Sequence, residues 1–264
     1  MKKSVIIVGG GFAGLELIKR IGNSPRYDTI LVDANNYNFF PPLIYQVSTG
    51  FMEPSAISYP FRKILRNLKN TRFRLGSLIK VVPSENKIIL SNGELHYDIL
   101  VMATGTESSF FGNKNIEKYS LPMKTISDAL TLRNTILTRL DRATRQDDQE
   151  ERKRLLTFVI AGAGPTGVEL SGILAEMKSS IIKKDYPELK ENDLGNIYLI
   201  DGQNTVLNTM SKNSQTYTHS KLIELGVEIK LNCLVKDFKD DIVLLSNGSK
   251  IESKNLIWAA GVTA

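Results

Sequence analysis

A strand that runs into a glycine loop and then into an amphipathic helix occurs twice in this chain. The first copy is Val5–Val8 followed by the loop Gly9–Gly14 (GGGFAG), and the second is Phe158–Ile160 followed by the loop Gly162–Gly167 (GAGPTG). A strand, a tight glycine turn and a helix open a βαβ unit in a parallel sheet. The repetition therefore predicts an α/β fold that contains two similar units.

The two halves also close alike. A hairpin signal, LSNG, ends at Gly93 in the first half and at Gly248 in the second, and an apolar run then leads to Gly105 or to Gly261. The first glycine of each loop precedes this closing glycine by 96 and 99 positions. A chance glycine motif would not bring a matched closing strand at nearly the same distance. We therefore predict two Rossmann-like dinucleotide-binding units.

The glycine spacing in each loop matches the chemistry of a pyrophosphate. The first glycine allows the tight turn, the second lets the backbone approach the phosphates, and the third lets the helix pack closely on the strand. The pyrophosphate then lies at the helix N-terminus, where unsatisfied N–H groups favour negative charge. One such motif alone is a weak signal, but here each copy follows an apolar strand and opens a helix.

An aspartate ends the second strand of each unit. Asp33 ends the run ILVD and lies 19 positions after Gly14, and Asp201 ends the run IYLID. A carboxylate there accepts hydrogen bonds from a ribose 2′-hydroxyl and repels a 2′-phosphate, so the sequence favours FAD and NAD over NADP. The alternative, that the aspartate only starts a turn, is stronger for Asp201 because Gly202 follows it directly.

Composition excludes several other classes. A single cysteine, Cys233, leaves no disulfide framework, cysteine-held iron–sulfur cluster or Cys-rich zinc site, so we expect no metal and a reducing, cytoplasmic compartment. Cys233 itself is expected to be a small core residue. No apolar run approaches the roughly 20 residues needed to span a bilayer.

The net charge of +6 is concentrated in a basic segment over residues 62–74. Apolar residues recur there at helical spacing from Phe61, while basic residues fill the other face (Arg62, Lys63, Arg66 and Lys69). We interpret this segment as the solvated face of a surface helix, with attraction to anionic lipid as the alternative, and expect no nucleic-acid binding.

These residues resemble the pyridine-nucleotide flavoproteins with two dinucleotide-binding domains, and among them the type II NADH dehydrogenases. The likeness spans nearly the whole chain. Beyond the first glycine loop it is carried by NYNFFPPLIYQ at residues 36–46, ATG at 103–105, GPTGVEL at 164–170 and WAAG at 258–261.

The resemblance implies a set of residues for FAD. Its pyrophosphate would lie on Gly9, Gly11, Phe12, Ala13 and Gly14. Asp33 would bind the adenosine ribose, and Leu78 would offer its backbone to the adenine. Towards the flavin would lie Pro42, Leu43, Ala103, Thr104 and Gly105.

A second set is implied for NADH. Its pyrophosphate would lie on Gly162, Gly164, Pro165, Thr166 and Gly167, its ribose on Asp201, and its nicotinamide end on Ala260 and Gly261. Glu169 is the expected catalytic residue, since the family places its counterpart near the stacked rings. The alternative for Glu169 is a helix-dipole role in the first helical turn. Tyr45 and Gln46 are weaker candidates for contacts on the acceptor side.

Hydride transfer from nicotinamide to flavin needs alignment and exclusion of water more than it needs a general base. Relatives that use redox cysteines need at least two, so electrons are expected to leave the flavin directly for a quinone, as in type II NADH dehydrogenases. We therefore predict an FAD-dependent, non-proton-pumping NADH:quinone oxidoreductase. Two alternatives remain: a ferredoxin or rubredoxin reductase, and a non-catalytic NADH-sensing module.

The expected domain limits follow from breaks in the pattern at Gly112, Asn113 and Pro122, with a helix over residues 128–142. We predict the first part of an FAD domain over 1–115, an inserted NADH domain over 116–254, and a return to the FAD domain over 255–264. The family continues past this point to a second flavin motif and a membrane-binding region, so a truncated chain is expected. The whole protein would then lie on the cytosolic face of the cell membrane as a peripheral protein, with a homodimer left open.

Overall fold

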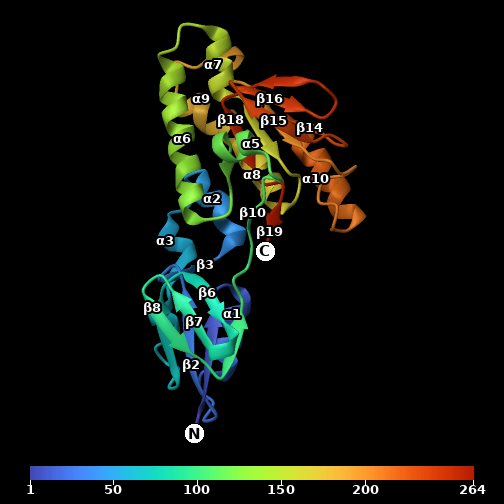
Figure 1. Ribbon diagram of the computed structural model, residues 1–264. Helices are drawn as coiled ribbons and strands as arrows, with labels where there is room; N and C mark the ends of the chain where they lie inside the picture. The colour runs from blue at the N-terminus through green and yellow to red at the C-terminus, as the bar shows by residue number, and fades with distance from the viewer. The chain divides into compact units, whose positions relative to one another are not determined.

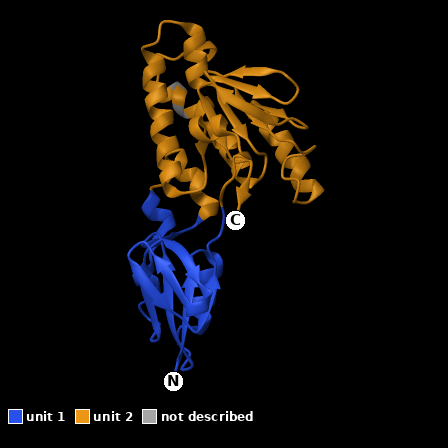
Figure 2. Cartoon of the chain, viewed as in Figure 1, with its two compact units in different colours: residues 1–40, 54–106, 264 blue, residues 41–53, 107–263 orange. Residues whose placement is uncertain are grey.

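The predicted duplication appears in the computed structural model as two separate parallel sheets (Figure 1). The chain forms two units, unit 1 with residues 1–40, 54–106 and 264, and unit 2 with residues 41–53 and 107–263 (Figure 2). The structure describes residues 1–180, 182 and 184–264 in full. Each unit is described by itself.

Unit 1 is built on a four-stranded parallel sheet. Its strands, in spatial order, are β5 (Thr71–Leu75), β2 (Tyr27–Asp33), β1 (Lys3–Val8) and β9 (Ile99–Met102). The apolar run of β1 explains its central place, because a strand covered on both faces needs apolar side chains on both. Val8 pairs with Val32 on one side and with Met102 on the other. The glycine loop after β1 therefore opens at the carboxyl edge of the sheet.

Two different layers cover the sheet of unit 1. Helices α1 (Phe12–Ile21) and α4 (Phe61–Leu65) pack on the face that carries Ile7. The opposite face, which carries Ile6, is covered by an antiparallel meander of β6 (Leu78–Val82), β7 (Lys87–Leu90) and β8 (Gly93–His96). Phe61 and Leu65 of α4 are buried, whereas the basic residues of this segment are exposed. The interpretation as a solvated helix face holds for Phe61–Leu65, whereas Lys69 lies in the turn that follows, and Arg72 and Arg74 lie on strand β5.

Unit 2 repeats the arrangement with one strand added at an edge. Its strands, in spatial order, are β14 (Val227–Lys230), β13 (Ile197–Ile200), β12 (Phe158–Ala161), β18 (Asn255–Trp258) and β11 (Leu121–Pro122). All neighbours are parallel. The first four strands have the order of β5-β2-β1-β9, so the α/β, Rossmann-like prediction is confirmed in both units.

The layers of unit 2 match those of unit 1. Helices α6 (Ile126–Thr144) and α8 (Pro165–Glu176) share one side of the sheet, with α10 (Lys212–Glu224) beside α8 and β14. The other side carries the meander of β15 (Val235–Lys239), β16 (Ile242–Leu245) and β17 (Lys250–Glu252) with helix α5 (Lys114–Tyr119) (Figure 1). Cys233 is buried against this meander, as predicted.

Helix α6 is longer than the predicted 128–142 because its start is capped. The Thr125 hydroxyl accepts a hydrogen bond from the Asp128 backbone N–H at 3.1 Å, and the Asp128 carboxylate accepts one from the Thr125 N–H at 2.8 Å. This capping box satisfies donors that have no partner within the helix. The helix therefore begins at Ile126, where the sequence pattern alone gave Asp128.

Three segments differ from the predicted domain limits, and the first is residues 107–115, which were expected in the first domain but belong to unit 2. Residues 255–264 were expected to return to the first domain, but β18 lies in the sheet of unit 2 between β12 and β11. Its four residues are buried and apolar except for Asn255, so they need cover on both faces. Residues 41–53 also belong to unit 2, because helix α2 (Ile44–Ser48) packs on α6 and α8.

The remaining elements are short. In unit 1 they are β3 (Tyr37–Phe39), α3 (Pro54–Ile57), β4 (Ser58–Pro60) and a 3-10 turn, Pro83–Glu85. In unit 2 they include the 3-10 turns Pro41–Leu43 and Glu191–Asp193 and the helices α7 (Gln149–Leu156) and α9 (Lys183–Asp185). The short strands β10 (Glu107–Ser108) and β19 (Val262–Thr263) of this unit pair with each other.

Candidate functional site

The glycine loop of unit 1 is packed so tightly that, at two of its positions, an added side chain would clash with backbone atoms. Gly9 has φ +106°, and a Cβ there would lie 2.1 Å from the carbonyl oxygen of Ala103. A Cβ on Gly14 would lie 1.9 Å from the carbonyl oxygen of Gly9. Both distances are far below contact, and both involve backbone. The loop is thus held between the closing turn after β9 and the first turn of α1.

Gly11 lies in the same loop but faces open space. No atom lies within 4 Å of the place where its Cβ would be. Gly11 is the N-cap of α1, and no side chain accepts a hydrogen bond from the first turn of that helix. Next to it, Phe12 is 59% exposed and Ala13 is also exposed. An open backbone surface at an uncapped helix N-terminus fits a pyrophosphate, which needs N–H donors and room.

Asp33 connects this loop to the second strand. One oxygen of its carboxylate accepts a hydrogen bond from the Gly10 N–H at 2.6 Å, and the other accepts one from the Asn35 N–H at 2.8 Å. Each carboxylate oxygen can accept more than one hydrogen bond. The side chain therefore fixes the loop, as a turn residue would, and retains the capacity to accept a ribose hydroxyl.

Unit 2 repeats these contacts closely. Gly162 also has φ +106°, and its Cβ would lie 2.5 Å from the carbonyl oxygen of Ala259 in the closing turn after β18. A Cβ on Gly167 would lie 1.8 Å from the carbonyl oxygen of Gly162. Gly164, the N-cap of α8, has no atom within 4 Å of its Cβ position. The second loop thus has the same closed and open positions as the first.

The acid of unit 2 makes the same pair of hydrogen bonds. The Asp201 carboxylate accepts from the Ala163 N–H at 2.6 Å and from the Gln203 N–H at 2.7 Å. The second bond is that of a turn-forming aspartate, which was the alternative considered for this residue. The first bond goes to the glycine loop, so the two interpretations of Asp201 are compatible.

A cleft of about 490 Å³ opens beside this loop in unit 2. It brings together three residues predicted from sequence, Gly162, Asp201 and Ala260. Two exposed apolar side chains, Phe111 and Leu234, also line it and were missed by the sequence analysis. Each could have been noticed in the sequence as a bulky apolar residue outside the periodic pattern of the strands and helices. Phe111 directly precedes Gly112, and Leu234 directly follows Cys233.

Glu169 lies on a separate groove of unit 2. This groove, of about 520 Å³, is formed by α8, α10, α2 and the segment after α2, and its lining includes Tyr45 and Gln46 of α2. The Gln46 side-chain amide donates to the Tyr45 hydroxyl at 3.1 Å. Three predicted residues from distant parts of the sequence thus share one groove. Desolvation raises the pKa of the Glu169 carboxyl above its ordinary value.

The predicted place of Glu169 in its helix needs correction. Helix α8 begins at Pro165, so Glu169 is its fifth residue and lies beyond the first turn. Because the helix dipole acts mainly on the first turn, it does not account for an acid at this position. The contact of Glu169 with the groove is therefore its more informative feature.

The residues predicted to lie towards the flavin are divided between the units. Pro42 and Leu43 belong to unit 2, whereas the turn at residues 103–105 belongs to unit 1, as does Leu78, the residue predicted for the adenine. Leu78 is the first residue of β6. Gly105 has φ +73°, and no atom lies within 4 Å of its Cβ position. Within unit 1, the backbones of Ala103 and Thr104 both lie against the glycine loop, at Gly9.

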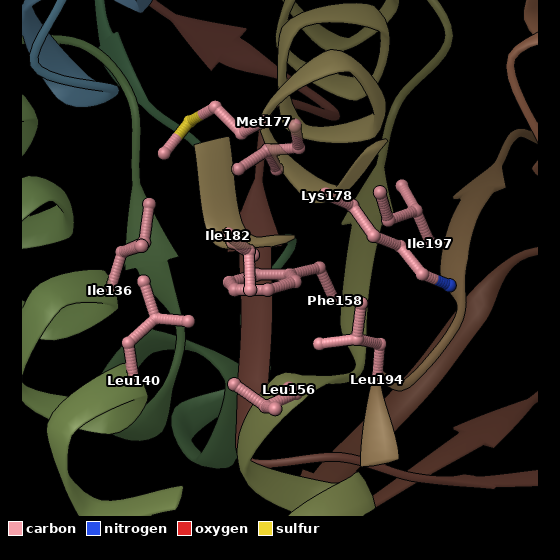
Figure 3. Close-up of a pocket in the computed structure, with 10 residues that line it drawn as sticks. Ile136, Leu140, Leu156, Phe158, Met177, Lys178, Ile182, Leu194 and Ile197 are labelled. Carbon is pink, nitrogen blue, oxygen red and sulfur yellow. The ribbon is translucent and has the colours of Figure 1, made fainter. Parts of the chain in front are cut away.

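One further cavity is a packing gap and not a binding site. It lies in the core of unit 2 between α6, α8 and the sheet, and apolar side chains such as Leu140, Phe158 and Ile197 surround it (Figure 3). Its volume is about 10 Å³, which is about the room that one water molecule needs. An apolar gap of this size has no capacity for a nucleotide or a quinone.

Two features are absent from the fully described residues. Among them, no helix combines the length and apolar character needed to cross a bilayer. Within the same residues, no group of three or more His, Cys, Asp or Glu side chains is placed to hold a metal ion.

Two loops with the same closed and open glycines, each beside an acid at a strand end, define a protein built to hold two dinucleotides. The chain belongs to the pyridine nucleotide-disulphide oxidoreductase family, which matches residues 3–264. The chain contains a single cysteine, Cys233, and its side chain is buried.

Similar proteins narrow the comparison. Over 98% of its length the chain is 34% identical to the type II NADH:quinone oxidoreductase Ndh of Mycobacterium tuberculosis. It is 29% identical over 99% to the external alternative NAD(P)H-ubiquinone oxidoreductase B2 of Arabidopsis thaliana mitochondria. The solved structure of NDH2 from Plasmodium falciparum in complex with NADH superposes on the whole chain with a TM-score of 0.92 and 26% identity. The chain spans 58%, 47% and 56% of these proteins. The resemblance to type II NADH dehydrogenases is confirmed.

Proposed function

We propose that this chain carries the nucleotide chemistry of an FAD-dependent NADH:quinone oxidoreductase, with FAD in unit 1 and NADH in unit 2. The observation that carries the proposal is the duplicated loop, in which Gly11 and Gly164 leave the same open space at a helix N-terminus. The assignment of FAD to unit 1 follows the resemblance. The binding of NADH by the chain is supported by the solved relative in complex with NADH.

The residues that would hold FAD surround the first loop. The backbone of Gly9–Gly14 would bind the pyrophosphate, and Asp33 would bind the adenosine ribose with the lone pairs that its backbone hydrogen bonds leave free. Leu78 would contact the adenine. Pro42 and Leu43 would lie towards the flavin with the turn that holds Ala103, Thr104 and Gly105.

NADH would bind in the cleft of unit 2. Its pyrophosphate would lie on Gly162, Gly164, Pro165, Thr166 and Gly167. Asp201 would bind the adenosine ribose and disfavour a 2′-phosphate, because two negative groups would meet at a partly desolvated place. Ala260 and Gly261, in the closing turn, would lie at the nicotinamide end.

Bound FAD would supply the capacity to accept a hydride and to release electrons to a quinone. The chain's own contribution is to hold both nucleotides in fixed positions and to keep water from the reacting atoms. Glu169 adds a carboxyl group with a raised pKa on the groove that Tyr45 and Gln46 also line. Because reduction of a quinone consumes protons, this groove is our candidate for the acceptor side, with Glu169 holding a proton at a carboxyl oxygen.

A quinone acceptor would be met at a membrane surface, and we propose the cytosolic face of the cell membrane as its location. The helical side of unit 1 supports this location with exposed cations of α4 and the turn after it, among them Arg62, Lys63 and Arg66. Anionic lipid attracts such groups, by about 1 kcal/mol for each cation near the surface.

The test is optical. Purified protein supplied with FAD should be yellow, should be bleached by NADH under anaerobic conditions, and should regain its colour when a soluble quinone such as menadione is added. Yellow protein that reoxidises with ferredoxin but not with quinone would indicate an iron–sulfur protein reductase. Protein that binds NADH but never holds flavin would favour a sensing module and would overturn the proposal.

A further inference from the structure

Phe111 occupies a backbone position that suits a different residue. It has φ +51°, the following Gly112 has φ +76°, and the Asn113 N–H donates to the Phe110 carbonyl at 2.9 Å. These three features describe a type I′ turn with Phe111 at its first central position, where Asn, Asp or Gly is preferred. A bulky residue in the left-handed region carries strain, which persists only where the surroundings impose it.

The Phe111 side chain also lies in an unusual environment for an aromatic ring. It is 73% exposed and lines the cleft of unit 2. Its ring contacts Gly261, where an added Cβ would lie 2.6 Å from the ring's Cζ atom. The ring also meets the edge of Trp258, with 6.2 Å between centroids and 67° between planes. A strained residue thus presents an apolar surface to the cleft and not to the core.

The segment before Phe111 is fixed to the closing turn. The Trp258 indole N–H donates to the Ser109 carbonyl at 2.7 Å, and the Ser109 N–H donates to the Gly261 carbonyl at 3.0 Å. The neighbouring ring of Phe110 packs beside Trp258, with 6.1 Å between centroids. The position of Phe111 is therefore set by rigid partners, as a residue that orients a ligand requires.

Leu234 is the counterpart of Phe111 at the other end of the cleft. It is 54% exposed, and a Cβ on Gly202 would lie 2.6 Å from its Cδ2 atom. Gly202 follows β13 and Gly261 follows β18, and these strands flank β12 on opposite sides. With its pyrophosphate on the loop after β12, a dinucleotide would direct its adenosine half towards Leu234 and its nicotinamide half towards Phe111.

We propose that Phe111 is a positioning residue that packs against the nicotinamide riboside half of NADH. This proposal rests on the proposed function. A ring seated on Gly261 restricts the space at that end of the cleft, so a bound nicotinamide would meet a flat apolar surface in place of water. The strain at Phe111 is retained because the residue that would relax the turn would also remove that surface.

Two ligands and two matched variants test this assignment. ADP-ribose shares the adenosine and pyrophosphate of NADH but lacks the nicotinamide. In calorimetry with the full chain, Phe111→Ala should lower the affinity for NADH by about tenfold. Its affinity for ADP-ribose should stay within about twofold of the wild-type value. Leu234→Ala should weaken both ligands to a similar extent. Phe111→Tyr should restore most of the NADH affinity.

A second readout separates positioning from folding. Phe111→Asn suits the type I′ turn, so it should raise the melting temperature. It should nevertheless lower the affinity for NADH relative to that for ADP-ribose by the same factor as Phe111→Ala does. Equal loss of NADH and ADP-ribose, or unchanged NADH affinity, in Phe111→Ala would overturn the positioning role. Failure of the wild-type chain to bind either ligand would overturn the proposed function itself.

Discussion

The glycine loops of units 1 and 2 agree in backbone more closely than in side chains. In both, the first glycine has φ +106°, the third position is open, and the sixth is closed by the carbonyl of the first. In both, one aspartate bonds to the loop and to the residue two positions after itself. The second position differs: a Cβ on Gly10 would meet the Phe61 ring at 2.1 Å, whereas unit 2 has Ala163 there. The shared features are therefore those that the nucleotide requires.

The acids that follow the loops differ more. Glu16 lies two residues after Gly14, and Glu169 lies two residues after Gly167. Glu16 is exposed and pairs with Arg20 one turn later at 2.7 Å. Glu169 has Ile173 one turn later, and both line the groove that Tyr45 also lines. One position in a repeated motif has thus become a surface ion pair in one unit and a partly desolvated carboxyl in the other.

The closed glycines should give the largest effect. Gly14→Ala and Gly167→Ala would each force a Cβ to within 2 Å of a backbone oxygen. We expect each to lower the free energy of unfolding by about 3 kcal/mol, measured by urea denaturation. Gly172→Ala in α8 is the matched control, because its Cβ would meet only Leu222 at 3.8 Å. That control should be neutral or stabilising. Equal effects in all three variants would contradict the packing described for the loops.

The open glycines should separate the two cofactors. The added methyl group of Gly11→Ala has room in the free chain but takes up space that a pyrophosphate needs. The variant should therefore lower the affinity for FAD by more than about a hundredfold and leave the affinity for NADH unchanged. Gly164→Ala should do the reverse. Flavin absorbance after gel filtration and NADH calorimetry measure the two affinities. If each variant impaired the other cofactor, the assignment of the units would be inverted.

The acids at the strand ends come next. Asp201→Ala should weaken NADH by roughly 1.5–3 kcal/mol, about ten- to a hundredfold, and should narrow the preference for NADH over NADPH. Because Asp201 also bonds to the loop at Ala163, Asp201→Asn is the control that keeps an acceptor there. Titration with both nucleotides measures the change. Unchanged NADH affinity in the alanine variant would leave Asp201 as a turn residue only.

The smallest effects concern Glu16 and Glu169, and they should have opposite signs. Glu16→Gln removes an exposed i, i+4 ion pair and should lower stability at neutral pH by about 0.3–0.5 kcal/mol. Desolvation raises the folded pKa of Glu169 above its ordinary 4.5, so ionisation of Glu169 opposes folding. Glu169→Gln should therefore gain stability relative to wild type as the pH rises from 4 through the folded pKa. Denaturation at pH 4 and pH 7 measures both changes, and a loss at pH 7 in Glu169→Gln would contradict this account.

The sequence was sufficient for the features that repeat. Two loops, two acids and two closing turns at matched spacing predicted both sheets, because strand order follows from the βαβ connection. The sequence was not sufficient to assign single segments to the correct unit. Residues 255–258 were placed in the first domain, since an apolar strand carries no mark of the sheet that it will join. Residues 41–53 joined unit 2 through the packing of α2, which periodicity does not reveal.

The candidate site, like the fold, was predicted from the sequence only in part. Residues that shape or bind the backbone of the loop, such as Gly162 and Asp201, were predicted because the glycine-loop motif requires these residue types at these positions. Phe111 and Leu234 were missed because a cleft is lined by side chains from separate loops, and no spacing rule connects them. The position of Glu169 was misjudged by less than one helical turn, which was enough to change its interpretation.

The late position of β18 in the sequence has a consequence for synthesis. Strand β12 leaves the ribosome about 100 residues before β18, its neighbour in the finished sheet, just as β1 precedes β9 in unit 1. During that interval each of these buried, apolar strands has one edge without a partner. An unpaired apolar edge invites association with other chains, so the strand at the centre of each unit is also one whose nascent state is exposed to such association. Slower translation before Asn255 would lengthen that exposure in unit 2.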